Sequence, residues 1–261
     1  EGASFDQVLS DAQRLGYAEA EPSLDVDGHD AAHKTGILAS LAHGFWVNPK
    51  HIHVEGIRNI SKVDMQFAAQ LGYTVKLLGI VKLIQKHGDE KSCDGLPIQV
   101  SVYPTFIPNS HVLASVNHVF NAIYVRGDVV GDTLYYGRGA GQDATASAVL
   151  SDLADAALDL KCGTKGRVRP FVPHEEDSEV LPLDAVVCRY YVRLDVVDRP
   201  GTLARIAAIL ARARIGISSV IQPEGHEGES VPLILMIHDA SNAAMNKALG
   251  QIARLPVVKG R

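Results

Sequence analysis

The sequence predicts an α/β (α+β) fold, in which a mixed sheet with helices on one face is followed by a smaller ferredoxin-like unit of order βαββα(β). Three observations predict it. Helical and strand-like patterns alternate along residues 1–162, an order typical of a sheet covered by helices. The stretch 163–187 is rich in glycine, proline and acidic residues without a regular period, so we interpret it as a linker. The alternation then restarts and continues through 188–261.

Hydrophobic spacing predicts the elements of the first domain, 1–162. Apolar residues at helical spacing indicate helices at 4–15, 30–44, 62–71 and 144–160. The helix 30–44 is apolar at Ala31, Ile37, Leu38 and Leu41. Apolar and β-branched runs bounded by turn residues indicate strands at 51–57, 73–85, 97–103, 119–125 and 133–136. We expect 73–85 to pair with 97–103, and the last two strands to be joined through a turn at Gly127 and Asp128.

The second domain, 188–261, reads as strand, helix, strand, strand, helix. The expected bounds are 189–196, 202–213, 217–222, 233–238 and 243–253. This order is one strand short of the ferredoxin-like βαββαβ unit, so we expect the last strand to be cut off by the end of the chain. The chain also opens inside a helical pattern, where Ser4 and Gln7 fit a capping box. We therefore expect a fragment of a longer protein.

Composition excludes several classes of protein. The 261 residues are 46% hydrophobic and 21% charged, which is typical of a globular protein with a core. A net charge of −5 argues against a nucleic-acid partner. No run of about 18 apolar residues exists to span a membrane, and the first residues lack the form of a signal peptide, so we predict a cytoplasmic location. Cys93, Cys162 and Cys188 are too scattered for a zinc site or a disulfide framework, so we expect them to be reduced and structural.

One short stretch, residues 16–34, combines carboxylates with a lysine. Asp30 and Lys34 are four residues apart at the start of the helix 30–44, so they share one face of it. Glu19 and Asp25 precede that helix on a loop broken by proline and glycine. Such a cluster suits an amino-acid substrate, since a fixed lysine can move a proton to or from its hydroxyl group. The same spacing also fits a helix N-terminus with a solvated ion pair.

The stretch resembles the signature of homoserine dehydrogenase. The matching residues are Ala12, Gly16, Tyr17, Pro22, Asp25, Val26, Gly28, Asp30 and Lys34. Glu21 departs from the pattern, because the family usually has Asp, Asn or Ser before the proline. Further segments resemble the substrate domain of that family, so the resemblance covers nearly the whole chain; they are 73–80, 102–105, 113–122 and 137–148.

The resemblance implies roles for individual residues. Lys34 corresponds to the proton donor and acceptor at the substrate's hydroxyl or aldehyde oxygen. Glu19 and Asp30 correspond to the carboxylates that bind homoserine, whose α-ammonium suits charge-assisted hydrogen bonds. Gly16 and Gly141 correspond to backbone contacts with the dinucleotide. Asp25 also belongs to the signature, and it either caps the next turn or supports Lys34 indirectly.

The reaction implied is NAD(P)-dependent interconversion of L-homoserine and L-aspartate 4-semialdehyde, in threonine, methionine and isoleucine biosynthesis. The family begins with a nucleotide-binding domain that has no counterpart in this chain, and that domain would bind most of the NAD(P). A monovalent cation, if the protein uses one, would also lie outside the chain. We therefore expect the chain by itself to be inactive.

The turn Gly137–Gly141 precedes the long helix 144–160. Glycines before a helix expose backbone N–H groups and allow a ligand to come close. The signal is weak by itself, because strand-to-helix turns also carry glycine for geometric reasons, and the spacing is not that of a dinucleotide fingerprint. Arg138 either adds positive charge near the cofactor or faces solvent.

The loop Asp198–Gly201 joins a predicted strand to a predicted helix and resembles the loop of ACT domains, which sense amino acids. N–H groups of such a turn can face a ligand carboxylate, or Pro200 and Gly201 simply start the helix. The resemblance implies allosteric control by L-threonine, with Asp198 and Gly201 in the effector loop. Ligands of ACT domains usually lie between paired copies, so we expect a homodimer or homotetramer.

Two other functions remain open from the sequence, namely a non-catalytic amino-acid-binding regulatory module and a scaffold for subunit assembly. The complete set Glu19, Asp30 and Lys34 argues against a pure sensor. His29 and His33 are four residues apart, and His51 and His53 alternate on a predicted strand, so either pair offers two metal ligands. No third ligand lies at a matching place, and we predict no metal site.

Overall fold

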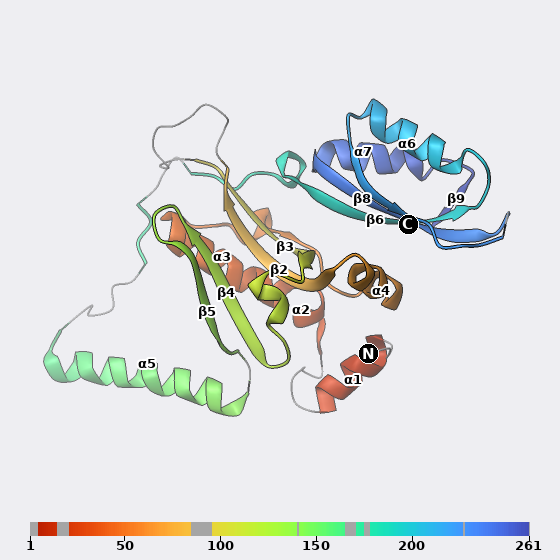
Figure 1. Ribbon diagram of the computed structural model, residues 1–261. Helices are drawn as coiled ribbons and strands as arrows, with labels where there is room; N and C mark the ends of the chain where they lie inside the picture. The colour runs from red at the N-terminus through yellow and green to blue at the C-terminus, as the bar shows by residue number, and fades with distance from the viewer. Residues whose placement is uncertain are drawn as a thin grey trace. The chain divides into compact units, whose positions relative to one another are not determined.

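A computed structural model describes residues 5–14, 21–84, 96–139, 141–164, 171–174, 178–226 and 228–260. The chain divides into two compact units. The second unit comprises the residues from Glu179 onwards with short pieces at Lys82 and Pro97–Gln99, and the first comprises the rest. Most elements of both units are labelled in Figure 1. The predicted α/β class with a ferredoxin-like second unit is confirmed.

The first unit contains the helices and strands that hydrophobic spacing predicts. Its helices are α1 (Phe5–Arg14), α2 (Ser23–Val26), α3 (His29–His43), α4 (Lys62–Gln70) and α5 (Gln142–Cys162). Its strands are β1 (His53–Val54), β2 (Tyr73–Leu83), β3 (Ile98–Pro108), β4 (Phe120–Gly127) and β5 (Gly131–Arg138). The strand expected at 51–57 is shorter, because Pro49–His51 form a turn of 3₁₀ helix. Helix α4 begins at a capping box, in which Ser61 and Asp64 satisfy each other's backbone N–H.

The strands of this unit form two sheets. Three of them lie in the order β1-β3-β2, with β1 parallel to β3, so the expected pairing of β2 and β3 is confirmed. The strands β4 and β5 form a separate antiparallel sheet, in register from Phe120↔Arg138 to Gly127↔Gly131. In Figure 1 this narrow hairpin is drawn in green, and α5 follows it along the chain.

Helix α3 packs on the larger sheet through small residues. Its buried positions are Ala32, Thr35, Gly36, Ala39 and Ser40. A Cβ atom at Gly36 would lie 2.9 Å from Ile52 Cδ1, and one at Gly79 on β2 would collide with the Thr35 side chain. The large apolar residues that predict this helix are exposed instead, with Ile37 60% and Leu41 55% exposed. The helix therefore approaches the sheet closely and leaves its other face open.

The second unit has the order βαββαβ. Its elements are β6 (Val187–Val197), α6 (Thr202–Arg212), β7 (Ile217–Ile221), β8 (Ser230–Ser241), α7 (Asn242–Ile252) and β9 (Val258–Gly260). The strands lie in the order β7-β8-β6-β9, and each pairing is antiparallel. Our expectation that the last strand lies beyond the chain is wrong. Val258–Gly260 pair with Asp195 and Val196 on β6, because the turn after α7 leaves enough residues for one short strand.

One hydrophobic core holds the second unit together. It is formed where α6 and α7 cover one face of the four-stranded sheet, and its fully buried members include Leu194, Ile206, Leu235, Ile237 and Met245. No helix among the described residues is sufficiently long and apolar to cross a membrane.

Truncating a side chain in this core tests its contribution to stability. We expect Leu235→Ala to lower the free energy of unfolding by about 2–5 kcal/mol, because the leucine is fully buried and its removal leaves a cavity. Val220→Ala on β7, where the valine is 41% exposed, should cost only about 0.5 kcal/mol. Urea denaturation followed by circular dichroism measures both. Equal losses in the two variants would contradict this assignment of the core.

Candidate active site

The candidate active site lies on the turn between α2 and α3. The Pro22 carbonyl oxygen accepts hydrogen bonds from the N–H groups of Asp25 (3.1 Å) and Val26 (2.9 Å), which close the single turn of α2. Val26 is buried, and its carbonyl oxygen accepts from Ile57 N–H at 2.9 Å. A Cβ atom at Gly56 would meet that same oxygen and would lie 2.5 Å from Asp27 Cα. The turn is therefore held closely against the segment that follows β1.

Asp30 and Lys34 meet on an open face of α3. Lys34 Nζ donates a hydrogen bond to Asp30 Oδ2 at 2.6 Å, so the predicted shared face is confirmed. The Asp30 side chain is 42% exposed and the Lys34 side chain is 69% exposed. An exposed pair at this spacing adds little to stability. Its significance lies in access, because both charged groups can be reached by a small molecule.

The other residues predicted for this site are placed only in part. Gly16 and Glu19 lie outside the described residues. Asp25 is exposed on α2, where its carbonyl oxygen accepts from Gly28 N–H at 3.2 Å. This backbone contact does not distinguish between the two roles considered for the Asp25 carboxylate. The roles of these residues stay predictions.

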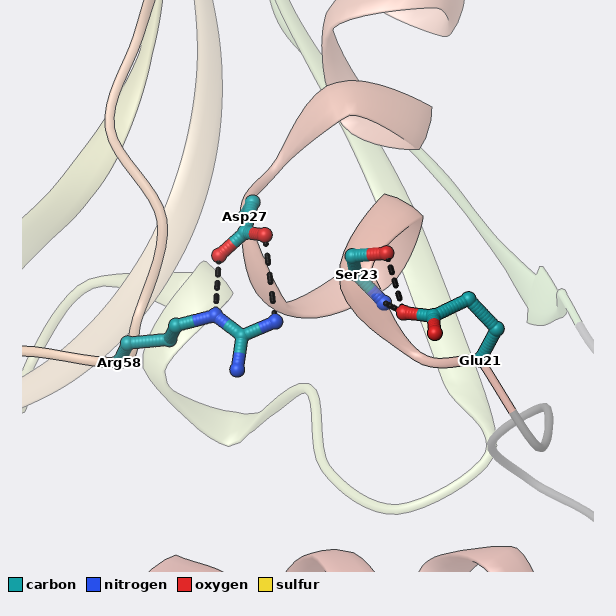
Figure 2. A network of polar contacts seen from close by, with 4 residues as sticks. All are labelled: Glu21, Ser23, Asp27 and Arg58. Carbon is teal, nitrogen blue, oxygen red and sulfur yellow. Dashed lines mark hydrogen bonds and ion pairs between the residues drawn. The ribbon is translucent and has the colours of Figure 1, made fainter.

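A second pair of polar contacts borders the same turn (Figure 2). Arg58 donates two hydrogen bonds to the Asp27 carboxylate, from Nε to Oδ1 at 2.5 Å and from Nη2 to Oδ2 at 3.2 Å. Glu21 Oε1 accepts from the Ser23 hydroxyl at 2.5 Å and from its backbone N–H at 3.4 Å. Glu21, the one departure from the family pattern, thus binds the first residue of α2.

These contacts shift the ionisation of the acids. The hydrogen bonds from Arg58 hold the pKa of Asp27 below its ordinary value. The hydrogen bonds from Ser23 lower the pKa of Glu21, with a smaller contribution from the charge of Arg58. Both sets of hydrogen bonds thus favour the carboxylate form, and beside the turn the charge of Asp27 is balanced by that of Arg58.

Of the glycine turn predicted before α5, Gly139 and Gly141 follow strand β5, whereas Gly137 and Arg138 belong to the strand itself and pair with β4. Gly141 is the N-terminal capping residue of α5, with φ of 116° and no side-chain cap. A Cβ atom there would meet nothing within 4 Å. Only glycine takes this φ easily, and the first N–H groups of the 21-residue helix that follows have no partner within the helix and no side-chain cap. The turn fits a phosphate-bearing dinucleotide in this respect.

In the second unit, the loop Asp198–Gly201 begins α6. Gly201 is the N-terminal capping residue, with φ of 86°. Asp198 Oδ1 accepts from Gln222 Nε2 at 2.9 Å, and the Asp198 backbone exchanges hydrogen bonds with Gly228 and Glu229 at 2.8 Å each. The Asp198 side chain therefore ties its loop to the end of β7.

Two features of the first unit were not singled out from the sequence. Arg58 lies 31 residues from Asp27, so no local spacing could relate them. Lys76 lies on β2 and donates to Val116 O and to Asn117 Oδ1. A basic residue inside the apolar run 73–80 was a signal of a buried partner. Among the described residues, no three His, Cys, Asp or Glu side chains gather closely enough to hold a metal ion.

Comparison with known proteins shows the family. The family model of homoserine dehydrogenase matches residues 1–154, and that of the ACT domain matches 190–256. The chain is 39% identical to homoserine dehydrogenase of Pseudomonas aeruginosa over 99% of its length, and 41% identical to that of Helicobacter pylori over 98%. The chain belongs to the homoserine dehydrogenase family.

A solved structure agrees with this assignment. A homoserine dehydrogenase from Thiobacillus denitrificans, 41% identical, matches all of the chain with a TM-score of 0.88. The chain spans 57% of that structure and 58% and 57% of the Pseudomonas and Helicobacter relatives, respectively.

The ion pair at Asp27 makes a prediction about pH. In Arg58→Ala we expect the Asp27 pKa to rise toward its ordinary value, because the hydrogen bonds that favour the carboxylate are lost. Because the pKa of Asp27 is lower in the folded protein than in the unfolded chain, the ion pair stabilises the fold at pH values above the unfolded-state pKa. This stabilisation is lost as the pH falls through the folded-state pKa. Carboxyl carbon NMR measures the titration.

Asp132 on β5 is the internal control for this experiment. Arg126 binds it and lowers its pKa to about 2. Its titration should be the same in both proteins. An unchanged Asp27 titration in the variant would mean that Arg58 does not hold this carboxylate in solution.

Proposed function

We propose that the protein to which this chain belongs interconverts L-homoserine and L-aspartate 4-semialdehyde with NAD(P). The observation that carries this proposal is the Asp30–Lys34 pair, charged, accessible and joined at 2.6 Å within the stretch matched by the family model. That match covers the first 154 residues, which favours an enzyme over a purely regulatory module.

On α3, Asp30 would bind the substrate and Lys34 would transfer the proton. Asp30 uses Oδ2 for Lys34, and its other oxygen can accept from the α-ammonium group of homoserine. Glu19, by resemblance, is the second acid for that ammonium. Lys34 Nζ, as the neutral amine, would take the proton of the substrate hydroxyl during oxidation, and the ammonium so formed would return it to the aldehyde oxygen during reduction. Asp30 would orient Lys34 for this transfer, since the two are already hydrogen-bonded.

The nicotinamide of NAD(P), when bound, supplies hydride transfer. The residues of this chain proposed to meet the dinucleotide are Gly141, whose missing side chain leaves the space in front of α5 open, and Gly16. We assign the choice between NAD and NADP, and any monovalent cation, to regions outside this chain.

The second unit is proposed to regulate the enzyme. Its ACT domain suits an amino-acid effector, and we propose L-threonine, a later product of the same biosynthetic route. Binding between paired domains would require a homodimer or homotetramer. We also propose a cytoplasmic location, where such biosynthesis and reduced cysteines are both expected.

The role of Lys34 is tested in the full natural gene product. We expect Lys34→Ala to lower kcat for homoserine oxidation by about 10²–10⁴-fold, the usual contribution of a positioned acid–base group. Lys50→Ala, in an exposed 3₁₀ turn, should keep wild-type activity. NAD(P)H formation at the nicotinamide absorbance measures both. Undiminished activity of Lys34→Ala would remove the lysine from the mechanism.

The effector proposal predicts a direct binding signal. Titration calorimetry of the natural gene product with L-threonine should show binding, and Asp198→Ala should weaken it by about tenfold, or roughly 1.4 kcal/mol, because that side chain holds the loop to Gln222. Asp239→Ala, exposed on β8, is the matched control and should bind normally. Absence of threonine binding by the wild type would exclude threonine as the effector.

A further inference from the structure

Lys76 is a lysine with no role in the chemistry proposed above and with an unusual environment. It lies on β2 of the larger sheet and is half-buried. Burial lowers the pKa of its ammonium group. Its Nζ donates to the carbonyl oxygen of Val116 and, at 2.8 Å, to Asn117 Oδ1. Placing an ammonium group there has a cost in desolvation that these two acceptors offset.

The two acceptors belong to the connection that leads into β4. Asn117 is bound again on its other side, since its Nδ2 donates to Ser115 O at 3.2 Å. The Asn117 carbonyl oxygen accepts from Phe120 N–H, the first residue of β4, at 3.3 Å. Lys76 therefore links the larger sheet to the open end of the β4–β5 hairpin, where β4 begins. The hairpin itself forms a separate sheet.

The same connection, residues 116–119, also contacts the glycine turn in front of α5. Gly139 N–H donates to Val119 O at 3.2 Å, within the connection that Lys76 binds. The Asn121 side chain of β4 occupies the space where a Cβ atom of Gly139 would be. The last pairs of the hairpin, Phe120↔Arg138 and Asn121↔Gly137, continue this contact into the turn. Gly141 follows two residues later and begins α5.

We propose that Lys76 is a positioning residue for the dinucleotide, which fixes the connection 116–119 and through it the glycine turn at Gly139 and Gly141. The proposal rests on the function proposed above. Lys76 touches neither the substrate nor the nicotinamide in this role. Its effect is to hold the turn at one place relative to the larger sheet, on which α3 carries Asp30 and Lys34.

Kinetics of the full natural gene product give the first test. We expect Lys76→Met to raise KM for NAD(P) by at least about tenfold, because small displacements of binding groups are costly, while KM for homoserine changes less than about twofold. Lys76→Arg keeps charge and donors and should return KM for NAD(P) to within about threefold of wild type. Lys82→Met, an exposed lysine on the same strand, is the matched control and should behave as wild type.

Hydrogen exchange gives a second test that needs neither ligand nor activity. In Lys76→Met the N–H groups of Phe120 and Gly139 should exchange at least about tenfold faster, whereas those of the β1-β3-β2 sheet keep their protection. Unchanged exchange at both amides would overturn the proposal. So would an unchanged KM for NAD(P), or a KM that rises equally for both substrates.

Two outcomes separate this proposal from the proposed function. If the wild type oxidises no homoserine but Lys76→Met still loosens Gly139 and weakens NADPH binding in a fluorescence titration, the function is wrong and the positioning role stands. If homoserine is oxidised but Lys76→Met matches wild type in both tests, only the positioning role is wrong. Should Lys76→Met fail to fold, Asn117→Ala removes one acceptor and decides the question by the same measurements.

Discussion

The close approach of α3 to the sheet is the constraint on which the first unit depends. Small residues on its buried face allow it, and the absence of a side chain at Gly79 leaves room for Thr35. Since the buried face has almost no bulk, the helix has little freedom to rotate without a clash, and close packing fixes its orientation. Asp30 and Lys34 consequently lie on the open side, where a ligand can reach both charges. Packing, rather than the ion pair, thus places the candidate active site.

Around that helix, polar contacts of modest individual strength fix the chain between regular elements. Arg58 binds Asp27 in the turn before α3, and Lys76 binds the connection before β4. Both connect segments that lie far apart in the sequence. The two contacts differ in energy, because Arg58 is half exposed and its ion pair is screened by solvent, whereas Lys76 is half-buried and its loss would leave two acceptors without their donor.

The two units differ in how they are stabilised. The ACT domain has a continuous apolar core between two helices and four strands, with several side chains fully buried. By contrast, α5 of the first unit buries none of its residues, and leucines such as Leu150 and Leu153 are more than half exposed. The relatives are longer than this chain, which spans 57–58% of their length. The second unit is thus stabilised by its own core, while helix α5 of the first unit presents apolar side chains at the surface.

Local patterns in the sequence determined most of the elements and the pairing of Asp30 with Lys34. A period of 3.6 residues and a spacing of four are properties of a single helix, and they hold whatever surrounds it. Which face of α3 is buried was decided only by the tertiary structure, because large exposed residues such as Ile37 and Leu41 carry the same helical period as a core face. Likewise, β9 forms only because β6 offers it a free edge. The partners of Arg58 and Lys76, 31 to 41 residues away, are brought into reach only when the sheet and its connections pack together.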